Sequence, residues 1–238
     1  MKKQIFLTPL QGKKLIAAAL AENAALLSAA REHTLVIVAG TTNGFIAKAV
    51  LKKLGFGDFD AGKFFRGVFS GKKMAGANPP KDVVIRKGEL ITDMSIDEIA
   101  PALGVGDLLL NGGNALYLPA EQVGVVIGNP ALGTMGHILS AVYGRRASLL
   151  MPIGLEKRVE FPIDELEAFC NAEDMAGPRL MFAPGVPYTE LDALESVGVS
   201  ALILAAGGVE GYEGGVLLGL EGDKKALDKA DRLLESIK

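Results

Sequence analysis

Apolar positions along the chain follow two different patterns, and these predict an alternation of strands and helices. Residues 34–39 form an unbroken apolar run, which is typical of a strand buried on both faces. Residues 43–54 instead place apolar side chains three and four positions apart, which predicts an amphipathic helix that ends at Gly55. Upstream, a capping box at residues 8–11 predicts a helix that reaches about Arg31.

The same patterns continue through the middle of the chain. Residues 83–91 are expected to form a hairpin-like pair, and further apolar runs predict strands at residues 107–110, 123–127 and 147–151. Because helical segments separate these strands, we expect an α/β fold with a Rossmann-like, mostly parallel sheet and helices on both faces.

The last third of the chain has a different order of elements. Its pattern predicts a strand at 179–183, a helix at 187–196, strands at 200–205 and 214–220, and a helix at 223–237. This βαββα order predicts a small C-terminal α+β lid. We therefore expect two units, a Rossmann-like domain at 1–157 and a lid or subdomain at 158–238.

Composition excludes several classes of protein. The 238 residues carry a formal net charge of −3, which argues against nucleic acid as a partner. Cys170 is the only cysteine, and the two histidines lack metal-binding spacing, so we expect no metal, no cofactor and no disulfide. No segment approaches 18 uncharged apolar residues, so the expected protein is cytoplasmic, without a membrane partner.

Loops rich in glycine, asparagine and threonine follow four of the predicted strands, at 40–44, 111–114, 128–136 and 152–157. Ligands of open parallel sheets bind beyond the carboxyl ends of the strands, and helix N-termini attract anions. We therefore expect these loops to meet around an anionic small molecule, although glycine is also common in such turns for backbone reasons alone. The candidate ligand-binding residues in them are Gly40, Thr41, Thr42, Asn43, Asn111, Gly112, Gly113, Asn114, Gly133 and Thr134.

Basic charge is concentrated between residues 63 and 87, where seven basic residues accompany one acid, Asp82. In an acidic protein, such a glycine-rich basic segment suggests a clamp over an anionic ligand, with Lys72 and Lys73 as candidate contacts. A solvated loop with ordinary surface lysines explains the same charges.

Three residues are candidates for proton transfer. Glu156 and Lys157 follow a predicted strand where active-site loops lie, and an exposed ion pair is the alternative interpretation. His137 falls in the first turn of a predicted helix, where the dipole favours neutral imidazole, although a structural histidine fits as well.

The order of the loops resembles the superfamily that holds ribose-5-phosphate isomerase, glucosamine-6-phosphate deaminase and the CoA transferases. The stretches that carry this resemblance are Gly40-Thr41-Thr42-Asn43, Asn111-Gly112-Gly113-Asn114-Ala115 and the loop 128–136. The C-terminal βαββα segment is similar to the small lid of the pentose isomerases. The resemblance implies a phosphate- or CoA-type ligand, and Glu156 is the best candidate for a counterpart of the transferase nucleophile.

The sequence also departs from that pattern. Asn111 and Asn114 stand where an isomerase would carry catalytic aspartates, and amides cannot act as general bases. The leading hypothesis is an enzyme that isomerises a sugar phosphate, with acyl or CoA transfer second. A non-catalytic ligand-binding or regulatory protein is the alternative. A homo-oligomer is compatible with this architecture.

Overall fold

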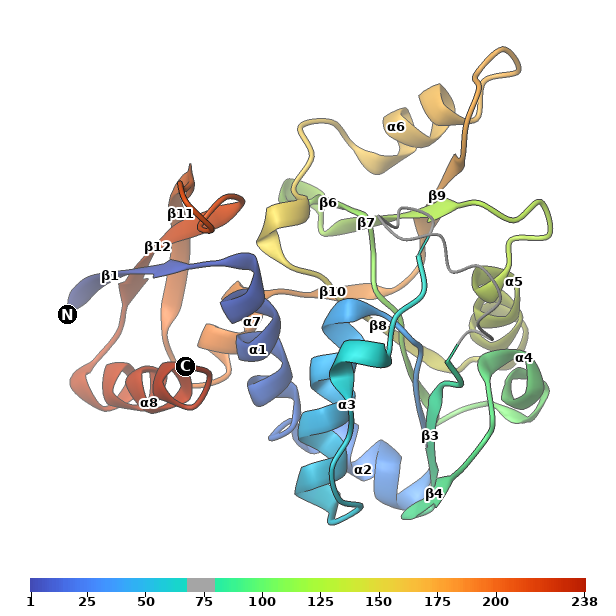
Figure 1. Cartoon of the computed structure of the whole chain (residues 1–238), viewed down its shortest axis with the longest axis horizontal. Coiled ribbons are helices and arrows are strands. Elements are labelled where there is room, and N and C mark those ends of the chain that lie inside the picture. The colour runs from blue at the N-terminus through green and yellow to red at the C-terminus, as the bar shows by residue number, and fades with distance from the viewer. Residues whose placement is uncertain (68–79) are drawn as a thin grey trace.

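The structure is a computed structural model that describes residues 1–67 and 80–238. Within these residues, three β-sheets are surrounded by helices (Figure 1). The largest sheet has six strands in the order β10-β8-β5-β2-β3-β4. The four strands from β10 to β2 run parallel, whereas β3 and β4 form an antiparallel hairpin against β2. These strands are β2 (Thr34–Ile37), β3 (Val83–Arg86), β4 (Glu89–Ile91), β5 (Leu108–Leu110), β8 (Ser148–Pro152) and β10 (Val186–Tyr188).

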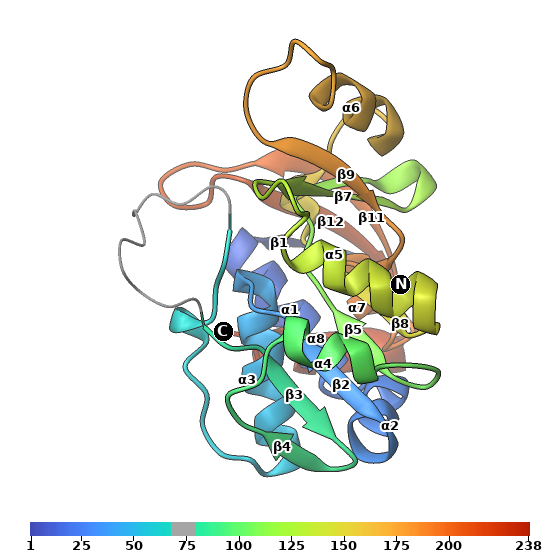
Figure 2. The same ribbon diagram turned by 90° about the vertical axis from the view of Figure 1, so that its right-hand side faces the viewer.

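Helices cover both faces of this sheet, as Figure 2 shows. Leu35 and Ile37 of β2 pack with the apolar sides of three helices, while the alternate residues Val36 and Val38 pack with two others on the opposite face. The first group is α1 (Pro9–Leu20), α2 (Ala24–Glu32) and α3 (Thr41–Leu54), and the second is α4 (Ile96–Ile99) and α5 (Thr134–Leu139). Strand β2 is thus buried on both faces, as its unbroken apolar run predicts.

Two smaller sheets are antiparallel and each has three strands. The sheet β6-β7-β9 carries α6 on one side, and its elements are β6 (Ala115–Tyr117), β7 (Gln122–Ile127), β9 (Arg179–Ala183) and α6 (Ile163–Cys170). The sheet β1-β12-β11 packs with two helices, and its elements are β1 (Lys2–Leu7), β11 (Ser200–Gly207), β12 (Gly215–Glu221), α7 (Glu190–Glu195) and α8 (Lys224–Glu235).

The α/β class is confirmed, but a Rossmann-like sheet is not. The strand expected at 123–127 forms as β7, yet it pairs antiparallel with β6 and β9 instead of joining the parallel strands. An apolar run reports burial and not the direction or identity of its neighbours, which explains this error. The predicted hairpin at 83–91 is present as β3 and β4.

Strand pairing also crosses the expected domain boundary at 157/158. Strand β9 pairs with β7, and β10 pairs with β8. At the other end, β1 from the start of the chain pairs with β12 of the expected lid. The single N-terminal helix expected up to Arg31 is in fact two helices, because Asn23 caps α2 by accepting a hydrogen bond from the Leu26 N–H at 3.0 Å.

The chain leaves β2 in one direction to build β3 and β4, and then returns to build β5, β8 and β10 on the other side of β2. The order of strands therefore reverses next to β2, and the carboxyl ends of β2 and β5 lie side by side. None of the helices in the described ranges is both long and apolar enough to cross a lipid bilayer.

Candidate functional site

A cavity of about 420 Å³ lies beyond the carboxyl ends of β2 and β5. Three of the four expected loops line it, namely 40–43, 111–114 and much of 128–135, and the fourth contributes Lys157. The loop 128–135 reaches this place from β7, although β7 belongs to a different sheet. Eleven of the predicted site residues therefore meet around one cavity: Gly40, Thr41, Thr42, Asn43, Asn111, Gly112, Gly113, Asn114, Gly133, Thr134 and Lys157.

Two further predicted site residues, His137 and Glu156, do not line this cavity. His137 is exposed on α5 and lies near Asp97 of α4. Glu156 precedes Lys157, but one of its carboxylate oxygens is buried next to Gly154, outside the cavity lining. Lys72 and Lys73 lie outside the described residues.

The start of α3 forms one wall of the cavity. Gly40 is the N-cap, no side chain caps the helix, and the first intrahelical bond runs from the Gly44 N–H to the Gly40 carbonyl at 2.8 Å. The N–H groups of the preceding helical residues therefore have no acceptor within the helix, and the helix dipole adds a partial positive charge there. Thr41 is exposed at this wall, whereas Thr42 is buried.

Asn43 joins the two strands whose ends form the floor of the cavity. Its amide nitrogen donates to the Val38 carbonyl at 2.8 Å and to the Leu110 carbonyl at 3.2 Å. The expected role of the Asn43 side chain as a donor to an oxyanion is therefore not supported, because both N–H groups of its amide already donate to backbone carbonyls. Asn43 is a structural link between the ends of β2 and β5.

The two asparagines of the 111–114 loop differ in burial and in which of their side-chain atoms form hydrogen bonds within the protein. Asn111 is almost fully buried, and its amide nitrogen donates to the Gly112 carbonyl and to the Met135 sulfur. Asn114 is exposed, and its side-chain oxygen accepts from the Val126 N–H at 2.9 Å. The side-chain N–H₂ of Asn114 is thus better placed than that of Asn111 to donate to a molecule in the cavity.

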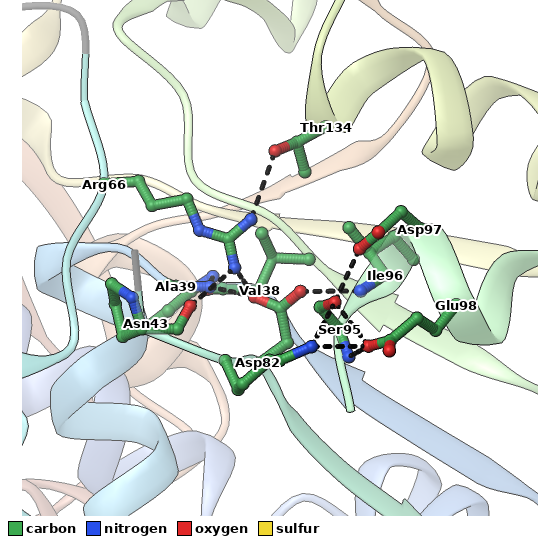
Figure 3. A network of polar contacts seen from close by, with 12 residues as sticks. Val38, Ala39, Asn43, Arg66, Asp82, Ser95, Ile96, Asp97, Glu98 and Thr134 are labelled. Carbon is green, nitrogen blue, oxygen red and sulfur yellow. Dashed lines mark hydrogen bonds and ion pairs between the residues drawn. The ribbon is translucent and has the colours of Figure 1, made fainter. Parts of the chain in front are cut away.

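Arg66 is a cavity residue that the sequence indicated only as one member of a basic segment. Its guanidinium pairs with Asp82 and donates to the Pro80 carbonyl at 3.1 Å and to the Thr134 hydroxyl at 3.4 Å (Figure 3). The side chain of Arg66 remains 25% exposed, whereas that of Asp82 is completely buried. The one acid in the basic segment therefore orients its cavity-lining arginine.

Asp82 also fixes the backbone on two sides of the site. It accepts from the Ala39 N–H at 2.8 Å and from the Ile96 N–H at 2.7 Å, so one carboxylate joins the end of β2 to the start of α4. Burial raises the pKa of Asp82, and the charge of Arg66 opposes that shift. Figure 3 shows the carboxylate between Arg66, Ala39 and Ile96.

Lys157 provides the second positive charge. Its ammonium donates to the Gly113 carbonyl at 2.7 Å, which holds it against the 111–114 loop. Burial lowers the pKa of Lys157, while the nearby Glu156 and Glu190 act in the opposite direction. The short helical turn η5 (Leu155–Lys157) that carries it is held by Glu190, which accepts from the Leu155 N–H at 3.0 Å.

The charged side chains among the described lining residues of the cavity are both basic, although Asp82 pairs with one of them from outside the lining. Arg66 and Lys157 line the cavity, and no aspartate or glutamate is found among its described lining residues. Nor do the described ranges contain any group of three or more histidine, cysteine, aspartate or glutamate side chains able to hold a metal ion. Two basic side chains and an uncapped helix N-terminus therefore meet at one cavity.

No family model, curated protein or solved structure matches this chain.

Proposed function

We propose that this protein binds an anionic small metabolite, of the phosphate-ester or coenzyme A type, at the carboxyl ends of β2 and β5. The observation that carries the proposal is the lining of the cavity, where Arg66 and Lys157 lie beside the N-terminus of α3 and no carboxylate is found among the residues that the structure describes. The volume of about 420 Å³ lies within the range of small-molecule sites. The meeting of the three loops also supports a remote relationship to the isomerase and CoA-transferase superfamily.

Replacing Lys157 by methionine is expected to weaken the binding of anions about ten- to hundredfold, because a charge-assisted hydrogen bond would be lost. Isothermal titration calorimetry with inorganic phosphate, glucose 6-phosphate and acetyl coenzyme A, at fixed ionic strength, measures this. Lys48→Met is the matched control, since Lys48 is exposed on α3 and does not line the cavity. Equal affinities for Lys157→Met and the unaltered protein, or no binding of any of the three anions, would refute the proposal.

A catalytic function is favoured by the position of Lys157, which lines the cavity against the 111–114 loop and whose pKa is lowered by burial. A lysine whose pKa is lowered releases its proton more readily, and its amine can then accept a proton from a carbon next to a carbonyl. Isomerisation of a sugar phosphate is therefore the first candidate reaction. Transfer of an acyl group to Glu156 gains no such support, because the Glu156 side chain does not line the cavity.

Proton abstraction by Lys157 predicts that the protein exchanges the carbon-bound proton of an open-chain sugar phosphate for deuterium. Glucose 6-phosphate and ribose 5-phosphate in D₂O, followed by NMR, are suitable probes. Lys157→Met should abolish the exchange, whereas Lys48→Met should leave it unchanged. Binding without exchange in the unaltered protein would instead favour the non-catalytic alternative, consistent with the amides of Asn111 and Asn114.

A further inference from the structure

A second cavity, of about 710 Å³, adjoins the anion-binding cavity at Thr41, which lines both. The second cavity lies between the start of α1, the first turns of α3, residues 61–65 and the tip of the hairpin between β11 and β12. The two cavities are therefore neighbours on either side of the α3 N-terminus.

The lining of the second cavity is largely apolar. Phe45, Phe65 and Leu10 face it, and Leu10 and Phe65 keep 51% and 36% of their surface exposed. Large apolar side chains gathered around a hollow are a common feature of ligand sites, where they provide contact area for rings. The polar residues at this cavity include Lys13 and Glu213, which carry opposite charges.

Two chain segments connect the apolar cavity with the anion-binding cavity. Thr41 and Phe45 are four residues apart in α3, so they lie on the same face of the helix, about 6 Å apart along its axis. Phe65 immediately precedes Arg66, and these neighbours line the second and the first cavity respectively. Each segment thus supplies one residue beside the anion and one aromatic ring next to it.

We propose that the second cavity receives a planar aromatic ring of the same ligand whose phosphate occupies the first cavity. The ligand class would then be a phosphate ester that carries an aromatic or heteroaromatic group. This inference rests on the proposed function, because the phosphate must bind beside Thr41, Arg66 and Lys157. Phe45 and Phe65 offer the ring a stacking surface, and Lys13 and Glu213 offer a donor and an acceptor to ring heteroatoms.

The test compares methyl phosphate with phenyl phosphate, which have the same charge and differ in the ring. Calorimetric titration of the unaltered protein should give about tenfold or tighter binding of phenyl phosphate. This gain should disappear in Phe65→Ala and in Phe45→Leu, while the affinity for methyl phosphate stays constant. Leucine retains apolar packing at position 45, where the side chain also contacts the core. Phe169→Ala, which removes an exposed ring on α6, is the matched control and should keep the full gain.

The outcomes separate this inference from the proposed function. Equal affinity of the unaltered protein for both phosphates would overturn the aromatic ligand class and leave the anion site intact. A gain that persists in both phenylalanine variants would also overturn it. Absence of binding of either phosphate would refute the anion site itself, and the inference with it.

Discussion

Replacing Asp82 by alanine is expected to lower the free energy of unfolding by about 3–5 kcal/mol, the largest effect we predict for a single substitution. The carboxylate of Asp82 has no exposed surface and accepts hydrogen bonds from Arg66 and from the backbone of Ala39 and Ile96. Alanine would leave two backbone N–H groups and a partly buried guanidinium without their acceptor.

Urea denaturation followed by circular dichroism measures this loss. Asp58→Ala removes the same charge from an exposed position and should change stability by less than about 0.5 kcal/mol. Asp82→Asn retains one acceptor oxygen and should lie between the two. If Asp82→Ala were as stable as Asp58→Ala, the carboxylate would not be the link that joins β2 to α4.

The second large effect is a dependence of stability on pH that Glu190 should produce. Burial, together with the charge of Glu156, raises the pKa of Glu190 to about 7, while the Leu155 N–H and Arg158 oppose the shift. A glutamate in an unfolded chain has a pKa near 4.5. Between these two values the folded state binds more protons than the unfolded state, so stability must fall as the pH rises.

Between pH 4.5 and pH 7, the free energy of unfolding should therefore fall by about 3 kcal/mol, and this loss is complete above pH 7. Glutamine at position 190 can still accept from the Leu155 N–H but does not titrate. Glu190→Gln should therefore lack this part of the pH dependence, and its stability relative to the unaltered protein should increase from pH 4.5 to pH 8. Urea denaturation at a series of pH values measures the difference.

Glu195→Gln is the matched control for this experiment, because Glu195 is exposed on the same helix, α7. Its stability should follow that of the unaltered protein over the whole pH range. Parallel curves for Glu190→Gln and the unaltered protein would show that Glu190 is not protonated preferentially in the folded state.

Local sequence patterns predicted the elements and loops of the site better than the sheets around them. The apolar run of β2 and the glycine-rich turn after it identified one wall of the cavity, because strand burial and turn formation both depend on residues that are adjacent in the sequence. The antiparallel setting of β7 and the pairing of β1 with β12 depend on contacts between distant segments. Periodicity within one segment contains no information on such partners.

Individual side-chain roles were predictable only where the neighbours were local. Asn43 was expected to bind a ligand, but its donors bind Val38 and Leu110, and the second of these comes from another strand. The lone acid of the basic segment, Asp82, indicated that a basic residue would pair with it, but the sequence did not distinguish Arg66 from the other basic residues.

The pairing of β1 with β12 has a consequence for the time at which the protein can complete its fold. Lys2 lies opposite Glu221, and Leu7 lies opposite Val216, so β1 sits beside a strand from the far end of the chain. During synthesis on the ribosome, β1 emerges before β12 and cannot pair with it until all the residues between the two strands have been added. Such distant pairing slows folding. Completion of this sheet is therefore a late event, and until then the apolar side chains of β1 have no strand to pair with.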